Sequence, residues 1–211
     1  TLASEFVPLS ANQASITVVP AAADPASTVV SGAGMFGAVA NVPALFTVRL
    51  SDEFGNTLID GDDVVTGTVS GADTATVSTT YNGAGSYGAS YVVTEAGSYT
   101  LSMTVNGVDV IVPPSAVLVG PATVDVSKTL LVGLTDGTWV YTAGSDTPAS
   151  LTIVSRDEFG NLRLGGDDAF AVQVSDGDFA VPVAVVYTTN GEYVATFTTE
   201  IAGSFVGDVS L

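Results

Sequence analysis

The sequence contains one internal repeat, and this repeat constrains the fold more than any other feature. The pentapeptide Asp52–Asn56, Asp-Glu-Phe-Gly-Asn, recurs as Asp157–Asn161, and a strand-like run precedes each copy, at 44–50 and at 149–154. A chain of 211 residues has room for two domains of about a hundred residues each. We therefore expect two tandem copies of one domain, separated near Gly120.

The stretches between the repeated markers have the two-residue period of β-strands. Tyr193, Ala195 and Phe197 share one face of such a run, and Asn106-Gly107 is a typical hairpin turn. Glycine occurs 23 times, and Val, Thr, Ala and Ser are abundant, which favours strands and tight turns over helices. The predicted fold class is all-β, with two tandem β-sandwiches and no helix longer than a turn or two.

The composition excludes most enzyme chemistry. The chain has no cysteine and no histidine, which removes disulfides, zinc sites, thiol nucleophiles and Ser-His-Asp triads. Its 22 acidic residues stand against four basic ones, for a formal net charge of −18, which disfavours binding of nucleic acid. No run of about 18 apolar residues is present, so we expect no membrane span. We expect no enzymatic activity and no cofactor.

Turn and strand markers occur in the same order in both repeats. In the first repeat they lie at 31–35, 46–48, 52–56, 96–99 and 105–107, and in the second at 156–161, 165–167 and 190–193. In these residues the sequence resembles filamin-type immunoglobulin-like repeats, two in tandem. The resemblance implies a seven-strand antiparallel sandwich for each repeat and no catalysis. Proteins with such repeats are typically cross-linkers, adhesins or extracellular arrays.

The second repeat ends one strand short of this pattern. In the first repeat, a strand over 97–105 turns at Asn106-Gly107 into a last strand. Leu211 aligns with the end of the strand before that turn, so the second repeat is expected to lack its last strand. A sandwich without an edge strand exposes core side chains and unpaired backbone groups, and an added strand repairs both. The predicted acceptor edge consists of Phe205, Val209 and Leu211.

A counterpart of the missing strand occurs at the N-terminus. Residues 14–32 match 115–133 without a gap, which places the N-terminal segment in register with the last strand of the first repeat. We therefore predict a donor strand segment at 1–23, followed by domains at 24–120 and 121–211. The predicted donor residues Val7, Leu9, Ile16 and Val18 align with Val108, Val110, Val117 and Val119.

The orphan strand and the open domain predict self-association. In an extended rod the N-terminal segment is far from the second domain of its own chain, so donation to another copy is favoured. Head-to-tail contacts of this kind form a helical filament unless they close a ring. The leading hypothesis is a structural subunit of an extracellular or cell-surface fibril that forms a homopolymer. The alternative is a fragment of a longer filamin-like array that acts as a cell-surface adhesive or ligand-binding module.

Acidic turns and two aromatic residues carry further hypotheses. Carboxylates in the Gly-containing turns are expected to shape those turns and cap backbone amides, with weak calcium binding as the alternative. Trp139 and Tyr141 lie where the second repeat has extra residues, and we expect them to pack near the core rather than form an exposed interface. The many Ser and Thr residues leave O-linked glycans open. The turn carboxylates are Asp60, Asp62, Asp63, Asp167 and Asp168.

Overall fold

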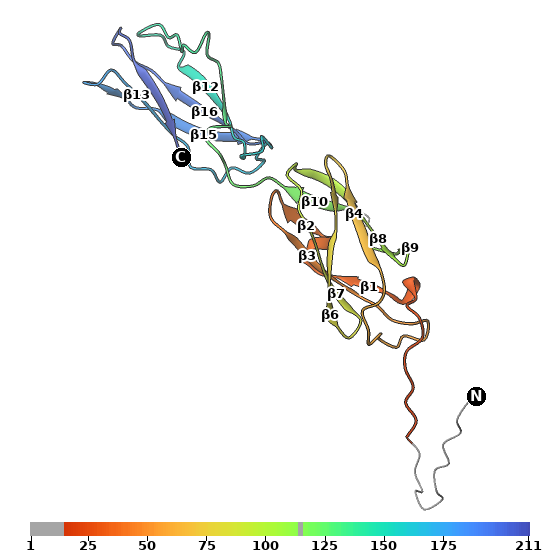
Figure 1. The fold of residues 1–211 in the computed structure, drawn as a ribbon. Helices are drawn as coiled ribbons and strands as arrows, with labels where there is room; N and C mark the ends of the chain where they lie inside the picture. The colour runs from red at the N-terminus through yellow and green to blue at the C-terminus, as the bar shows by residue number, and fades with distance from the viewer. Residues whose placement is uncertain (1–14, 114–115) are drawn as a thin grey trace, which may run out of the picture.

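The computed structural model describes residues 15–113 and 116–211, which fold into two β-sandwiches arranged end to end (Figure 1). We refer to residues 24–120 as unit 1 and to residues 121–211 as unit 2. The prediction of an all-β fold is confirmed. Helical structure in the described residues is limited to two 3-10 turns, η1 (Pro25–Ser27) and η2 (Ala33–Met35). No helix in this part of the chain is long and apolar enough to cross a membrane.

Unit 1 consists of two sheets. One sheet has the strand order β1-β3-β7-β6, and the other has the order β2-β10-β8-β4-β5 with β9 also paired to β8. Within this unit, β2 and β10 run parallel and the other pairs are antiparallel. The first sheet contains β1 (Val29–Ser31), β3 (Ala44–Arg49), β6 (Ser78–Gly83) and β7 (Ser86–Tyr91). The second contains β2 (Gly37–Val39), β4 (Val65–Ser70), β5 (Thr74–Thr76), β8 (Gly97–Val105), β9 (Val108–Val110) and β10 (Val117–Gly120).

Unit 2 repeats the first sheet of unit 1 and part of the second. Its sheets have the orders β11-β12-β16-β15 and β14-β13-β17. Ala149 lies opposite Phe197 just as Ala44 lies opposite Tyr91, so β12 and β16 pair in the register of β3 and β7. The strands are β11 (Leu130–Val132), β12 (Ala149–Val154), β13 (Ala171–Ser175), β14 (Ala180–Val181), β15 (Ala184–Thr189), β16 (Glu192–Phe197) and β17 (Val206–Ser210).

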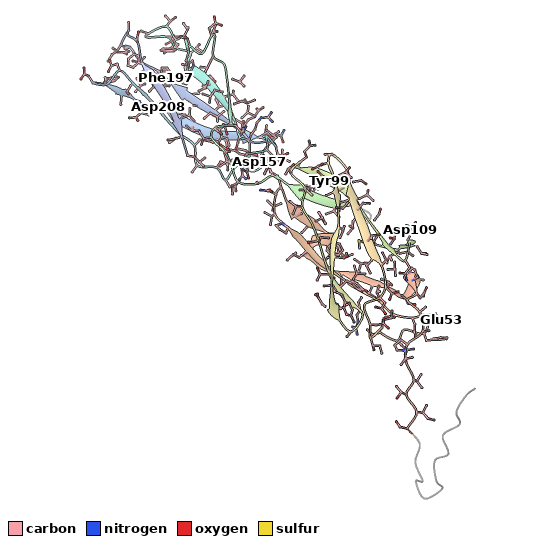
Figure 2. All side chains as sticks on the ribbon, viewed as in Figure 1. Glu53, Tyr99, Asp109, Asp157, Phe197 and Asp208 are labelled. Atoms are coloured by element: carbon pink, nitrogen blue, oxygen red, sulfur yellow. The ribbon has the colours of Figure 1, made fainter. Side chains whose placement is uncertain are left out.

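The two units meet at one end of each. Asp157 of unit 2 and Tyr99 of unit 1 lie near this junction, whereas Glu53 lies at the opposite end of unit 1 (Figure 2). The chain passes from β10 of unit 1 through Pro121 into unit 2. Unit 1 therefore has one end toward unit 2 and one end from which residues 15–23 extend (Figure 1).

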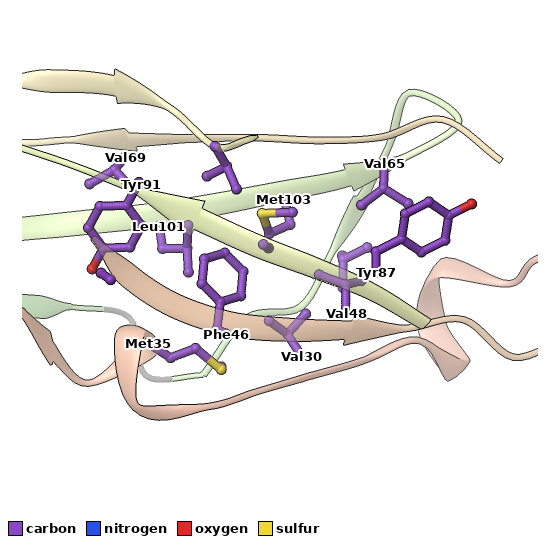
Figure 3. Close-up of a cluster of buried hydrophobic side chains, with 14 of the residues drawn as sticks. Val30, Met35, Phe46, Val48, Val65, Val69, Tyr87, Tyr91, Leu101 and Met103 are labelled. Atoms are coloured by element: carbon purple, nitrogen blue, oxygen red, sulfur yellow. The ribbon is translucent and has the colours of Figure 1, made fainter. Parts of the chain in front are cut away.

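Alternating burial along the strands produces the cores. Tyr193, Ala195 and Phe197 are 3%, 0% and 8% exposed, so the predicted inward face of β16 is confirmed. In unit 1, side chains from both sheets form one continuous core, part of which is shown in Figure 3. In unit 2 the buried side chains fall into two smaller clusters, one around Phe197 and one around Ile153. Unit 2 is the less completely packed of the two units.

The last strand of unit 1 forms as predicted, but in two pieces. Asn106 and Gly107 have φ angles of 52° and 82°, which suits the tight hairpin that joins β8 to β9. β10 then pairs with the start of β8. Val108, at the start of β9, does not face the core and is 56% exposed beside the hairpin turn. Its aligned residue Val7 therefore has no buried counterpart.

We predict that the closure of unit 1 depends on the inner face of β10. Val117 is 0% exposed and Leu118 is 67% exposed. Val117→Ala should lower the free energy of unfolding of unit 1 by about 2 kcal/mol, since it removes buried methyl groups and leaves a cavity. The matched control Leu118→Ala should change it by less than about 0.5 kcal/mol. Urea denaturation of the two variants measures both values, and equal losses would contradict this account of the edge.

Candidate functional site

An apolar groove lies between the sheets of unit 2, beside β17. Its volume is about 570 Å³. Trp139 and Phe197 form part of its wall, with ring centroids 4.7 Å apart in an edge-to-face arrangement, and Tyr141 packs on the same Phe197 ring at 5.5 Å. Trp139 and Tyr141 are only half-buried, so the groove is open to solvent. Its apolar lining also includes Leu151, Val172, Val174, Phe205 and Val209.

In unit 1 the corresponding place is filled by β10. This strand pairs antiparallel with β8, where Val117 lies opposite Tyr99, and parallel with β2, where Leu118 lies opposite Gly37. Val117 and Val119 enter the core and are 0% and 2% exposed. One strand thus supplies backbone partners to both neighbours and side chains to the core.

Neither rim of the groove has such a strand among the residues that the structure describes. β16 corresponds to β7 residue for residue, because both pair with the preceding strand in the same register. At the same distance along the chain from these strands, the segment 203–211 corresponds to β8. β17 pairs with β13 but with no second strand in the described chain. The segment 139–141, at the place of β2, belongs to no strand. A strand inserted between these two segments can bond to both, as β10 does in unit 1.

Two of the three predicted acceptor residues line this groove. Phe205 and Val209 are half-buried and contribute to its wall. Leu211 does not line it and is 57% exposed, just beyond the end of β17. Trp139 and Tyr141 pack near the core, as expected from the sequence, but their place in the groove wall was not predicted. The extra residues of the second repeat at this point were the available signal.

Two of the four predicted donor residues lie on the surface of the described chain. Ile16 and Val18 are 85% and 88% exposed. Val7 and Leu9 lie outside the described residues. Residues 15–19 belong to no strand. Among the residues that the structure describes, donor and acceptor residues do not come together within one chain.

A buried aspartate holds the segment that leads into each unit. Asp52 and Asp157 are 1% and 0% exposed. Asp52 Oδ2 accepts the Ala21 N–H at 2.9 Å, and Asp157 Oδ2 accepts the Ala122 N–H at 2.8 Å. Each carboxylate also accepts two backbone N–H groups of its own loop and the side-chain amide of the asparagine four residues later. Both lead-in segments are therefore fixed by the same set of bonds.

The Asp-Glu-Phe-Gly-Asn loop serves in the sequence as a repeat marker, and its role as an anchor was not predicted. The available signal was local chemistry. An aspartate that begins a short Gly-containing loop can bond to backbone amides two and four residues later. The partner in the lead-in segment is 31 residues away for Asp52 and 35 for Asp157, and only the folded chain reveals it.

Hydrogen bonding keeps both anchor carboxylates ionised. The side-chain amide of Asn56 lowers the pKa of Asp52 below the ordinary 3.8, against the opposing effect of burial, and backbone N–H groups lower it further. Burial raises the pKa of Asp157, but the hydrogen bonds from Asn161 and from backbone N–H groups outweigh it, and its pKa is also lowered from 3.8. The ionised carboxylates are therefore part of the fold.

The acidic turns have structural contacts of their own. Asp168 is 9% exposed and accepts hydrogen bonds from Ser155 Oγ at 2.6 Å and from Arg163 Nε at 2.9 Å. Asp63 Oδ1 accepts a bond from Asn106 Nδ2 at 2.7 Å. Among the described residues, no three carboxylates are grouped so that they could hold a metal ion. The structure supports the structural interpretation of Asp63 and Asp168 and gives calcium no support.

Comparison with known proteins identifies the first unit. Residues 22–115 match the family model described as the filamin/ABP280 repeat. The match agrees with the resemblance that the sequence markers of this part of the chain indicate. The assignment of a second such repeat to residues 121–211 stays a prediction.

Solved structures with the same fold include a bacterial adhesin and a bacterial integrin-binding protein. The Escherichia coli adhesin FdeC has a TM-score of 0.64 and 24% identity over 92% of this chain. The bacterial integrin-binding protein invasin has a TM-score of 0.58 and 18% identity over 89% of it, and InvD of Yersinia pseudotuberculosis has 0.51 and 18% over 87%. The chain spans 62%, 36% and 52% of these three structures. The likeness shows an immunoglobulin-like fold.

We predict that acid destabilises the chain through Asp157. Because its folded-state pKa is lowered, its contribution is fully present well above pH 3.8 and is lost as the pH falls through the folded-state pKa. Asp157→Asn should lower the free energy of unfolding of unit 2 by on the order of 1–3 kcal/mol at pH 7 and weaken its dependence on pH. Urea denaturation at pH 7 and pH 3 measures this, with Glu158→Gln at the exposed neighbour as control. An unchanged pH dependence in Asp157→Asn would show that other groups are responsible.

Proposed function

We propose that this chain is a non-enzymatic structural protein of the extracellular space or the cell surface, and that its copies join head to tail by donating a β-strand. In the proposed joint, residues 15–19 of one copy, with residues before them, occupy the groove in unit 2 of a second copy. The filamin-type repeat and the fold shared with FdeC and invasin support the surface location and the absence of catalysis. The internal geometry of the chain supports the strand donation.

A difference in burial between aligned residues carries this proposal. Val117 and Val119 are 0% and 2% exposed in unit 1, whereas Ile16 and Val18 are 85% and 88% exposed. Burying an apolar side chain of this kind contributes roughly 1.5–3 kcal/mol. Residues 15–19 therefore have the apolar pattern of an edge strand without a core to enter, and unit 2 has a groove of the matching kind.

The pairing in unit 1 defines the register of the joint. By analogy with Val117 opposite Tyr99, Ile16 of the donor lies opposite Phe205 of the acceptor. Val18 then lies opposite Gly203, and both side chains enter the groove. On the other side, the donated strand runs parallel to residues 139–141, as β10 runs parallel to β2. Each new backbone hydrogen bond adds about 0.5–1.5 kcal/mol.

The shape of the chain favours a second copy as the acceptor. Residues 15–23 extend from the end of unit 1 that points away from unit 2 (Figure 1). To reach the groove of its own unit 2, the segment would have to run back along all of unit 1. The groove of another copy, stacked on the free end of unit 1, is reached directly. Repetition of this contact gives an open polymer.

A second candidate function is adhesion by a module of a larger surface array. The fold shared with an adhesin and with an integrin-binding protein favours it. In this alternative, the groove of unit 2 and the segment 15–19 are completed by other parts of the same polypeptide. The two candidates differ in one measurable property, the association of purified copies of this chain.

We predict that two carboxylates on the inner face of the donor segment prevent association. The double variant Ile16→Asp/Val18→Asp should be monomeric where the parent chain polymerises, because unpaired carboxylates cannot enter an apolar groove. The matched control Ser15→Asp/Thr17→Asp makes the same charge change on the opposite face, which is exposed in β10 at Leu118. It should polymerise like the parent. Light scattering after gel filtration and negative-stain microscopy measure the outcome.

A peptide of residues 5–20 provides the complementary experiment. Added to the chain that lacks residues 1–20, it should bind unit 2 and raise its unfolding temperature without producing polymers. Polymers formed by the Ile16→Asp/Val18→Asp variant, or a peptide that does not bind, would refute strand donation. A parent chain that stays monomeric at high concentration would favour the adhesive module instead.

A further inference from the structure

Asn161 links the two units through its side-chain amide. The Ala96 N–H donates to Asn161 Oδ1 at 2.9 Å, and Asn161 Nδ2 donates to the Thr94 carbonyl at 2.7 Å. The same Nδ2 group donates to Asp157 Oδ2 at 2.8 Å. The turn between β7 and β8 of unit 1 is thus bonded to the loop that anchors the linker of unit 2. We call this set of contacts the inter-unit clasp.

The equivalent loop of unit 1 is built in the same way but is uncovered. Asn56 Nδ2 donates to Asp52 Oδ2 at 2.9 Å, as Asn161 does to Asp157, yet Asn56 is exposed and its Oδ1 has no partner within the described chain. Phe54 is 75% exposed, whereas its counterpart Phe159 beside the junction is 38% exposed. The free end of unit 1 therefore carries one half of a clasp.

Unit 2 carries the other half at its own free end. Counting from the shared registers of β7 and β16, the groups that correspond to the Thr94 carbonyl and the Ala96 N–H are the Glu200 carbonyl and the Ala202 N–H. Both residues are exposed, and neither group is hydrogen-bonded within the part of the chain that the structure describes. The two free ends of the chain are thus complementary.

We propose that a second copy of this chain docks on the free end of unit 1 through a clasp between Asn56 and its residues 200–202. In this contact the Ala202 N–H of one copy donates to Asn56 Oδ1 of the other, and Asn56 Nδ2 donates to the Glu200 carbonyl. The inference rests on the proposed strand donation, and it adds the surface and the orientation of the stacked copies. The joint between copies then reproduces the joint between units.

The linker geometry makes the two contacts compatible. In the intact joint, β10 ends at Gly120, and the Ala122 N–H is held by Asp157. In the donor segment, residue 19 aligns with Gly120, and the Ala21 N–H is held by Asp52. The same number of residues therefore separates strand and anchor in both places. A donor strand seated in the register of β10 brings the Asp52 loop against the 200–202 turn of the acceptor.

Chemical cross-linking tests this inference, because the chain contains no cysteine of its own. Two single variants, Phe54→Cys and Ala202→Cys, are mixed and treated with a short bis-maleimide. Phe54 is 75% exposed in the Asp52 loop, so its replacement leaves the Asn56 amide in place. We expect covalent dimers that contain one chain of each kind. The double variant Phe159→Cys/Ala96→Cys is the positive control, since the same reagent should join its two units within one chain. Asp109→Cys, on the flank of unit 1 (Figure 2), replaces Phe54→Cys as the negative control.

The outcomes separate this inference from strand donation. Placing Ile16→Asp/Val18→Asp in the Phe54→Cys chain should abolish the cross-link. If the parent polymerises, the Ile16→Asp/Val18→Asp variant does not, and the Phe54→Cys/Ala202→Cys mixture gives no more dimer than the Asp109→Cys mixture, strand donation stands and the clasp is refuted. If the Ile16→Asp/Val18→Asp chain still polymerises, strand donation itself is refuted.

Discussion

The pairing of β10 with β8 satisfies two physical requirements of unit 1 with one strand. Its backbone bonds to the edge of β8, and its alternating valines Val117 and Val119 complete the core at 0% and 2% exposure. A sandwich needs both effects, because an open edge leaves polar backbone groups unpaired and an open core leaves apolar surface in water. In unit 2 the described residues provide no strand at this place, and the result is an apolar groove and a core divided into two clusters.

The buried aspartates fix the segments that lead into each unit. Asp52 and Asp157 each tie an incoming segment to the loop that begins with the aspartate, and the loop's asparagine is left free to bond outward. Asn161 does so toward unit 1. Strand, linker and clasp therefore form one joint, in which the strand supplies the apolar burial and the amide sets the orientation of neighbouring units.

Several features of the fold could be predicted from the sequence because they depend on local chemistry. The period of two in β16, the Asn106-Gly107 hairpin and the gapless match between the N-terminal segment and β10 all follow from short-range patterns. The departures from the sequence pattern lie at the ends of strands. Val108 is exposed beside the hairpin, and Leu211 lies outside the groove, because strand ends are not covered by the opposite sheet.

The sequence by itself determined the all-β fold and the repeated strand and turn markers, since alternation and turn residues specify these without long-range contacts. Only the tertiary structure decided which side chains complete the core of unit 1 and which line the open groove of unit 2. The groove beside β17, the aromatic wall around Phe197 and the Asn161 clasp join residues far apart in the chain. Such contacts depend on how two sheets and two units pack, and no local pattern in the sequence encodes that geometry.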